Sequence, residues 1–120
     1  MNYDPWYENP KWLRVRKSAL RRDKYMDVYA KRFGKIKEAE VVHHIFPKND
    51  FPEYAYCLWN LISVSRQTHN TFHDRDSDEL TEKGRELLRK TAIRNGIEIP
   101  EEYLRKKPKG VTYGRDKYYI

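Results

Sequence analysis

The feature that most constrains this chain is the placement of its histidines. The sequence has four of them, and all lie in its middle third: His43, His44, His69 and His73. The first two lie in a β-rich segment, residues 40–46, which stops at Pro47 because proline cannot continue a strand ladder. Residues 61–64 are a second short strand candidate. Residues 65–75 lack glycine and proline and are predicted to form a helix, which would carry His69 and His73 on one face.

This arrangement favours a metal site. Successive strand residues point to opposite faces, so His43 and His44 are expected to point in different directions. One of the two can therefore join His69 and His73 around a cation while the other stays outside the ligand set. Three imidazoles leave coordination positions open for water or substrate, as in catalytic metal sites. A single histidine is more often an ordinary polar side chain, but four in a strand–strand–helix context favour metal binding. Asn70 stands where a zinc-protease box would need glutamate, so that box is excluded.

The remaining sequence divides into a basic front and a basic tail around this centre. Asn9-Pro10 predicts a helix start, with Asn9 as N-cap and proline at the first position, and the helix runs to about residue 22. A later helix is capped by Asp78 or Thr81 and ends at Asn95-Gly96. We expect one domain over residues 1–96, with its core motif at 40–76, followed by a basic, aromatic extension over residues 97–120.

Charge and composition narrow the classes of function. The chain has 25 lysines and arginines against 18 acidic residues, which gives a net charge of +7. Such an excess favours binding to polyanions, and nucleic acid is a more expected partner than a membrane surface. A merely solvated basic surface would have the same composition. The candidate DNA contacts lie on the first helix and in the tail: Arg14, Arg16, Lys17, Arg21, Arg22, Lys106 and Lys107. Cys57 is the single cysteine, which excludes an intramolecular disulfide and a cysteine-based zinc site and fits a reducing cytoplasm. No apolar run approaches the ~20 residues of a membrane helix.

Three segments together resemble the HNH endonuclease family. They are Glu40–Pro47, Leu58–Val64 and His69–His73, and the similarity extends over roughly residues 10–90, including the basic stretch before residue 25. The downstream segments His73–Arg75 and Leu80–Gly84 resemble small stand-alone HNH proteins of phages and prophages. The resemblance implies an α+β fold: a ββα-metal motif, in which a hairpin and a helix hold the ion, with flanking helices and mostly helical structure elsewhere.

The resemblance also implies residue roles. His43, His69 and His73 would bind the metal, His44 would be the general base, and Asn60 would hydrogen-bond the loop that orients His44. The implied reaction is hydrolysis of DNA, by nicking or double-strand cleavage, to a 5′-phosphate and a 3′-hydroxyl. The ion would be Mg, Mn, Ni or Zn; an all-imidazole ligand set suits Zn, Ni, Mn or Co better than Mg, although the family often uses Mg or Mn. If a phage encodes the chain, it would act in the host cytoplasm.

Two alternatives stay open, and one feature departs from the family. The chain could be a non-cleaving, metal-stapled DNA-binding module, or a DNA-packaging accessory that contacts a phage terminase. Many HNH relatives carry two Cys-x-x-Cys pairs that bind a structural zinc. Alignment places Asp27 and Ala30 at the first pair and Ser65 and Thr68 at the second. We therefore expect no structural zinc, with aromatic packing in its place. The aromatic candidates are Tyr25, Tyr29, Phe33 and Trp59.

Overall fold

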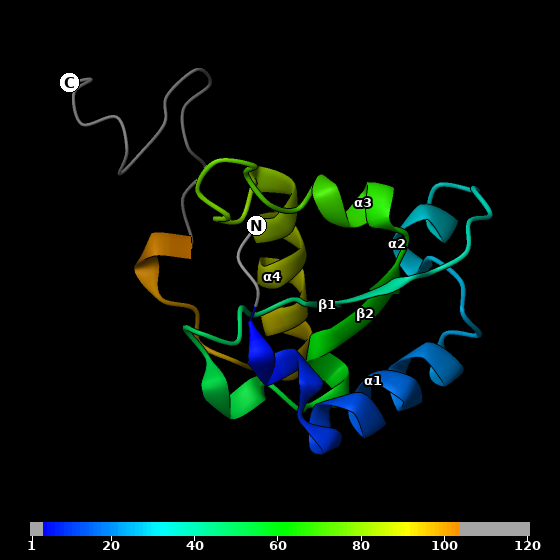
Figure 1. Ribbon diagram of the computed structural model, residues 1–120. Coiled ribbons are helices and arrows are strands. Elements are labelled where there is room, and N and C mark those ends of the chain that lie inside the picture. Colours follow the sequence, from blue (N-terminus) through cyan, green and yellow to red (C-terminus); the bar gives the residue numbers. More distant parts are fainter. Residues whose placement is uncertain (1–3, 104–120) are drawn as a thin grey trace.

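The computed structural model describes residues 4–103. Its elements, in chain order, are the 3-10 turn η1 (Pro5–Glu8), α1 (Pro10–Arg22), α2 (Val28–Lys31), β1 (Val41–His44), the 3-10 turns η2 (Pro52–Tyr54) and η3 (Leu58–Asn60), β2 (Leu61–Val64), α3 (Arg66–Asn70), α4 (Glu82–Asn95) and the 3-10 turn η4 (Glu101–Tyr103). The predicted α+β fold, a two-stranded hairpin with mostly helical structure around it, is confirmed (Figure 1). Over residues 4–103, no helix has the length and apolar character needed to span a bilayer.

The hairpin separates the two adjacent histidines. β1 and β2 are antiparallel, and His43 lies opposite Ile62 while His44 lies opposite Leu61. Residues directly opposite each other in an antiparallel pair project on the same side of the sheet. His43 and Ile62 therefore share one face of the hairpin, and His44 and Leu61 share the other.

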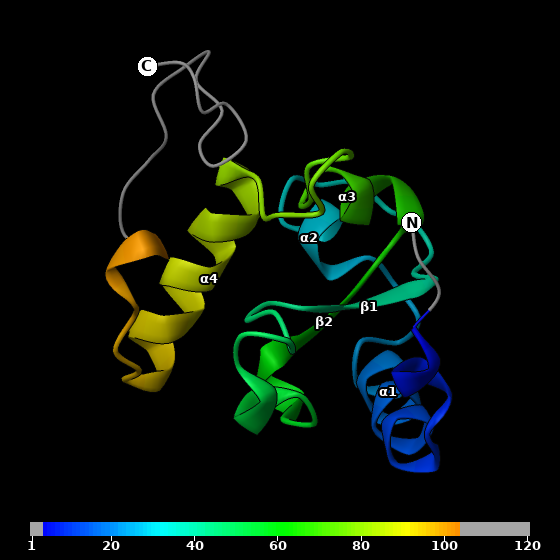
Figure 2. The ribbon, with the colours of Figure 1, turned by 60° about the vertical axis from the view of Figure 1, so that its left-hand side comes forward.

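Helices cover both faces of this hairpin, which Figure 2 shows from the side, with α1 and α4 on opposite sides of the strands. The cluster on the His44 face consists of Trp12, Ala19 and Leu20 from α1 with Val42 and Leu61. The larger cluster on the His43 face includes Ile62 and Val64 from β2, Phe72, and Leu87, Leu88 and Ala92 from α4. Each histidine of the pair thus lies over a different hydrophobic cluster.

The two long helices begin and end where the sequence signals indicate. Asn9 is the N-cap of α1 and Pro10 its first residue. Of the two candidate caps for α4, Asp78 and Thr81, the cap is Thr81. α4 ends at Gly96, whose φ of 65° lies in the left-handed region that glycine adopts without strain.

The predicted helix over residues 65–75 is shorter in the structure, and that part of the prediction is wrong. α3 ends at Asn70, and the amide of Phe72 then donates to a carbonyl three residues back in a tight turn. His73 follows in an isolated β-bridge with Leu80. His73 therefore lies just beyond the helix, held by a pairing with a residue farther along the chain.

The last described residues pack back onto α4. Ile97 and Ile99 contact the larger core cluster, and Tyr103 is buried in it. The hydroxyl of Tyr103 donates to Asp50 at 2.8 Å, and the guanidinium of Arg89 donates to the Tyr103 carbonyl at 3.0 Å. These contacts join residues 97–103 to the side of the molecule that carries the histidines.

Candidate functional site

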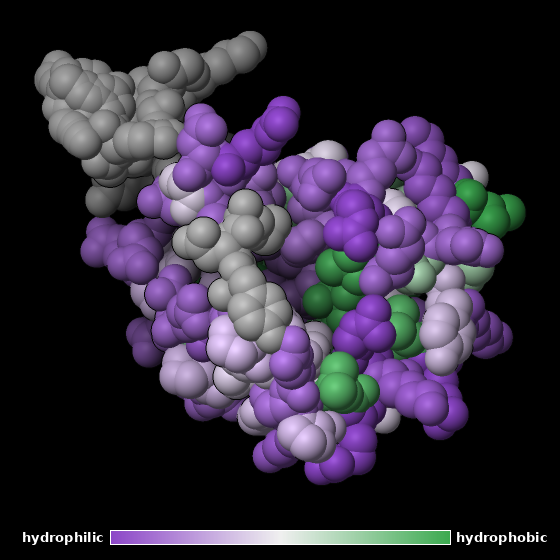
Figure 3. Space-filling view, in the orientation of Figure 1, coloured by the Kyte–Doolittle hydropathy of each residue, from purple (hydrophilic) through white to green (hydrophobic). Residues whose placement is uncertain are grey.

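A broad open cleft brings all four histidines to one face of the molecule. Figure 3 shows this face hollowed at its centre, with mostly hydrophilic side chains around the hollow. The cations that line the cleft are Arg16, Lys48, Arg66, Arg75 and Arg85. They are outnumbered by carboxylates, several of which lie on the loop of residues 74–79. A polyanion that enters the cleft therefore meets walls of mixed charge.

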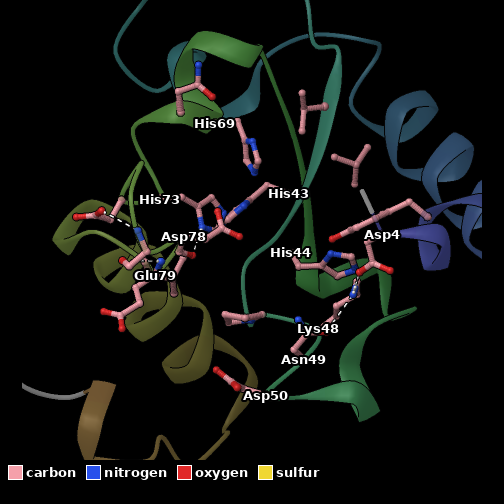
Figure 4. Close-up of a pocket in the computed structure, with 18 of the residues that line it drawn as sticks. Asp4, His43, His44, Lys48, Asn49, Asp50, His69, His73, Asp78 and Glu79 are labelled. Atoms are coloured by element: carbon pink, nitrogen blue, oxygen red, sulfur yellow. Dashed lines mark hydrogen bonds and ion pairs between the residues drawn. The ribbon is translucent and has the colours of Figure 1, made fainter. Parts of the chain in front are cut away.

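Three of the four histidines converge in this cleft. The ring centroids of His43 and His69 are 5.1 Å apart, those of His43 and His73 5.2 Å, and those of His69 and His73 4.9 Å. One ring nitrogen from each lies within 4.8 Å of the other two, and within residues 4–103 this is the one such group of metal-ligating side chains. Figure 4 shows the three side chains pointing toward one another. The cluster has the composition and spacing to hold one metal ion.

Each of the three rings is supported by a different element. His43 projects from β1 and packs against the ring of Phe72, with centroids 4.7 Å apart. His69 belongs to the last turn of α3. Nδ1 of His73 lies 3.2 Å from the backbone carbonyl oxygen of Asp78. Because a carbonyl only accepts hydrogen bonds, Nδ1 carries a hydrogen in this contact, and Nε2 is the ring nitrogen that remains to bind a metal.

The donor set fits a divalent ion. His43 is 1% exposed, and its Nε2 is a buried nitrogen without a hydrogen-bond partner. Such an atom costs about 1–3 kcal/mol, which coordination would remove. Burial, and then the neighbouring His69 and His73, lower the pKa of His43 well below its usual value. Burial and the adjacent His73 also lower the pKa of His69 to about 4. Both rings are therefore neutral at pH 7 and present lone pairs rather than positive charge.

His44 lies on the other side of β1 and points away from the cluster (Figure 4). Its Nε2 lies 3.0 Å from the carbonyl oxygen of Ala55, so Nε2 carries the hydrogen and Nδ1 the lone pair. Burial lowers the pKa of His44; the Ala55 hydrogen bond opposes this, and the positive charge of Lys48 adds to the lowering. His44 is thus a neutral imidazole outside the metal-binding cluster, in the protonation state that a general base needs.

Asn60 is fully buried and fastens the loop that follows β1. Its Oδ1 accepts a hydrogen bond from the amide of Phe46 at 2.7 Å, and its Nδ2 donates to the Phe46 carbonyl at 3.1 Å. Nδ2 also donates to the carbonyl of Tyr54 at 3.2 Å. Phe46 is two residues after His44, and Tyr54 precedes Ala55, the residue that accepts the His44 hydrogen bond. Asn60 therefore fixes the backbone on both sides of the His44 ring.

The predicted DNA contacts on α1 differ in where they lie relative to the cleft. Arg16 lines the cleft, where its guanidinium donates to the Glu40 carbonyl at 3.1 Å. Arg14, Lys17 and Arg21 are exposed and spaced three and four residues apart, so they share a face turned away from the buried stripe of the helix. This face does not border the cleft.

Arg22, the remaining predicted contact on α1, is exposed but bonded to other groups of the protein. Its guanidinium donates to the carbonyl oxygens of Leu58 and Leu61, each at 2.7 Å, and pairs with Asp23 at 2.8 Å. It therefore ties the end of α1 to the start of β2. Lys106 and Lys107 lie outside the described residues.

Of the four other cations that line the cleft, Arg66 and Lys48 were not among the predicted DNA contacts, and each pairs with a carboxylate. Arg66, at the start of α3, pairs with Glu40 at 3.5 Å. Lys48, just after β1, pairs with Asp4 at 2.8 Å, and its side chain is 10% exposed. Neither stands in a run of charge that would single it out. Only the folding of α1, β1 and α3 around one cleft brings these residues near the histidines.

Hydrogen bonds join the four positions at which the zinc-binding cysteines of many HNH endonucleases would align. The carboxylate of Asp27 accepts from the amide of Ala30 at 2.8 Å and from that of Ser65 at 2.9 Å. Oγ of Ser65 accepts from the amide of Thr68 at 3.1 Å and lies 3.1 Å from Oγ1 of Thr68. Asp27 is 1% exposed. This network links the N-cap of α2 to the N-cap of α3, the helix that carries His69.

The aromatic packing predicted for this region is present only in part. The ring of Tyr29 contacts Phe33 and Phe72, with centroids 5.3 and 5.2 Å apart. Tyr25 and Phe33 are nevertheless 47% and 66% exposed, and Trp59 packs in the loop between the strands. The prediction was wrong in giving these rings the main role, because the buried polar network lies at the centre of the region.

The comparison with solved structures agrees with this geometry. The chain is similar to the crystal structure of an HNH endonuclease from the deep-sea thermophilic bacteriophage GVE2, which contains a manganese ion. The two are 29% identical, the match covers 54% of this chain and 71% of that chain, and the TM-score is 0.53. No protein-family model and no curated protein matches the chain. The resemblance to the HNH endonucleases and the ββα-metal form of the α+β fold are confirmed.

Proposed function

We propose that this protein is a metal-dependent endonuclease that hydrolyses phosphodiester bonds of DNA. One observation carries the proposal: of two adjacent histidines on β1, His43 joins a cluster of three imidazoles, while His44 lines the same cleft from the opposite face of the strand. Similarity to the phage HNH endonuclease structure supports it. In this proposal His43, His69 and His73 hold one divalent ion, and His44 accepts the proton of the attacking water.

When bound, the divalent ion supplies charge neutralisation at the phosphate and at the leaving oxygen. The protein contributes three imidazoles, and this softer ligand set favours Mn, Ni or Zn over Mg. The related phage structure contains manganese, which supports the same order. We propose a single ion for each chain and no structural zinc, because the Asp27 network occupies the positions that the second ion would need.

His44 and Asn60 act together in the proposed reaction. Nδ1 of His44 takes the water proton, while Nε2 keeps its hydrogen bond to the Ala55 carbonyl. Asn60 does not react; it holds the backbone at Phe46 and Tyr54, and so orients the His44 ring. The expected products carry a 5′-phosphate and a 3′-hydroxyl.

The proposed path of the DNA follows the rim between α1 and α3. Arg16 and Arg66 flank Glu40 on this rim and can contact phosphates. The acidic loop of residues 74–79 would repel the backbone from the opposite wall. The remaining predicted contacts, the outer face of α1 and the basic tail, would add weaker, salt-dependent attraction: Arg14, Lys17, Arg21, Lys106 and Lys107.

Cleavage of supercoiled plasmid, with Mg, Mn, Ni or Zn added in turn, tests the proposal. Wild type should nick or linearise the plasmid, and a ligase should reseal the nicks because the ends carry a 5′-phosphate and a 3′-hydroxyl. His44→Ala should abolish cleavage while binding metal as wild type does. His69→Ala should lose both cleavage and metal binding. Wild type that binds DNA and metal but never cuts would refute the nuclease proposal and favour a non-cleaving binding module.

Paired variants test the proposed DNA path. Arg16→Ala with Arg66→Ala removes two cations from the rim, and Arg14→Ala with Arg21→Ala removes two from the outer face of α1, so both double variants lose the same net charge. The rim variant should weaken DNA binding more than the outer-face variant does. It should also make the slope of log Kd against log salt concentration shallower, by an amount that corresponds to about two phosphate contacts at most. An equal or greater loss in the outer-face variant would contradict the proposed path.

A further inference from the structure

We propose that Trp12 is a positioning residue for His44: its indole holds the plane of the imidazole so that Nδ1 faces the substrate. The inference rests on the proposed function, in which His44 is the general base. It goes beyond the sequence patterns, which place Trp12 simply on the buried stripe of α1.

A single hydrogen bond does not fix an imidazole ring. The bond from Nε2 of His44 to the Ala55 carbonyl holds one atom of the ring, and the ring can still tilt about it. The indole of Trp12 stacks on the face of His44, with centroids 4.8 Å apart and planes at 27°. The indole of Trp6 meets the same imidazole at 65°, with centroids 5.7 Å apart. The hydrogen bond thus sets the position of the ring, and the two indoles set its plane.

Trp12 is itself held rigidly. It is 3% exposed, and its amide donates to the N-cap Asn9 at 2.7 Å, which fixes the first turn of α1. Its indole packs against Trp6, with centroids 5.3 Å apart. A side chain on a capped helix start that packs into a hydrophobic cluster has little freedom, as a positioning residue requires.

The segment before α1 is fastened at the same place. Lys48 pairs with Asp4 at 2.8 Å (Figure 4), and its ammonium lies 5.0 Å from the ring centroids of both Trp6 and Tyr7. Asp4 in turn accepts a hydrogen bond from the amide of Trp6 at 2.9 Å. These contacts hold residues 4–8 over His44. The N-terminal segment therefore completes the surroundings of the proposed base, although it lies far from the histidine motif in sequence.

The experiment compares Trp12→Phe with Trp12→Leu. Phenylalanine keeps a flat ring for the imidazole to stack on, whereas leucine keeps an apolar side chain without a plane. Leu20→Ala serves as the matched control, because Leu20 belongs to the same buried cluster and its loss also destabilises α1 packing. Single-turnover cleavage, DNA affinity, metal affinity and thermal stability are measured for all of them.

We expect Trp12→Leu to lower the single-turnover rate at least tenfold, since small displacements of a catalytic group are costly, with DNA and metal affinity within about twofold of wild type. Trp12→Phe should stay within about threefold of the wild-type rate, and so should Leu20→Ala despite its lower melting temperature. Wild-type cleavage by Trp12→Leu, or equal rate losses in all three variants, would overturn the proposal.

Imidazole ¹⁵N–¹H spectra of the metal-free protein provide a readout that does not depend on activity. Wild type and Trp12→Phe should show His44 as the Nε2–H tautomer. Trp12→Leu should show signals averaged between the two tautomers, because the tilted ring loses its hydrogen bond to the Ala55 carbonyl. An unchanged His44 pattern in Trp12→Leu would overturn the proposal. If wild type cuts no DNA, the proposed function fails, and the spectra still decide whether Trp12 orients His44.

Discussion

Replacing Asp27 tests how this chain supports its metal-binding cluster. Asp27→Ala removes the acceptor for the amides of Ala30 and Ser65, now bonded at 2.8 and 2.9 Å. Hydrogen bonds to a charged group contribute about 1.5–3 kcal/mol each, so the free energy of unfolding should fall by about 3–6 kcal/mol. Small domains are stable by only about 5–15 kcal/mol, so this is a large fraction. Asp27→Asn keeps one acceptor oxygen, but its NH2 group would face the second backbone N–H, so it should also be destabilised by more than one hydrogen bond.

The loss should also depend on pH. Burial alone would raise the pKa of Asp27, but hydrogen bonds from Ala30, Thr68 and Ser65 together outweigh it and hold the pKa below its usual 3.8. A carboxyl with a depressed pKa stabilises the fold above the pKa of the unfolded chain and loses that contribution as pH falls through the folded value. The difference between wild type and Asp27→Ala should thus be constant above about pH 5 and shrink below about pH 4.

Urea unfolding of the metal-free proteins, followed by circular dichroism, measures these differences. Glu86→Ala is the control, because the exposed pair of Glu86 with Lys90 at 3.8 Å should contribute less than about 1 kcal/mol. Metal titration should also show weaker binding in Asp27→Ala, because Ser65 anchors the helix that carries His69. The reasoning is refuted if the free energy of unfolding of Asp27→Ala is within about 1 kcal/mol of the wild-type value, which is less than the contribution of one hydrogen bond to a charged group.

Three further predictions follow from the site. Asn60→Ala removes three hydrogen bonds, two of them buried, and should lower the free energy of unfolding in urea by about 3 kcal/mol. Cleavage should be lost even where the variant stays folded, and full activity would contradict the positioning role of Asn60. Gly84→Ala would bring a Cβ within 2.7 Å of the Phe72 carbonyl oxygen, so we expect the free energy of unfolding to fall by about 1–3 kcal/mol. Calorimetry should also show weaker metal binding. Unchanged stability and unchanged metal affinity would show that α4 can shift to accommodate the methyl group. The pKa of His44 is lowered, and a general base must be neutral to accept a proton. The single-turnover cleavage rate should therefore rise with pH, with the midpoint of the rise below the usual histidine pKa of 6.5. A midpoint above about pH 7 would contradict the role of His44 as the base.

The elements that could be predicted are those whose signals are local. The start of α1 depends on Asn9 and Pro10, and the end of α4 depends on Gly96, so the residues themselves specify these boundaries. The end of α3 was not predictable in this way. It depends on the bridge between His73 and Leu80, a contact that no helix propensity between residues 65 and 75 reveals.

The same distinction holds at the site. The histidines could be recognised because four of them cluster in sequence and a strand must turn two neighbours to opposite faces. The supports of those histidines come from distant segments: Trp12 stacks on His44, and Asp27 anchors the start of α3. Hydrophobic periodicity predicts that Trp12 is buried, but it does not indicate which side chain the indole contacts. A lone aspartate gives still less indication that it accepts hydrogen bonds from two helix starts.

The two faces of the hairpin are supported by separate parts of the protein, and this has a functional consequence. The imidazole cluster is held by α3, by the loop before α4 and by the Asp27 network, whereas His44 is held by α1, by η1 and by Ala55. The two supports lie on opposite faces of the short hairpin. Substitutions on the α3 side should therefore weaken metal binding while leaving the His44 tautomer intact. Substitutions on the α1 side should do the reverse, so that metal binding and proton transfer can be impaired independently.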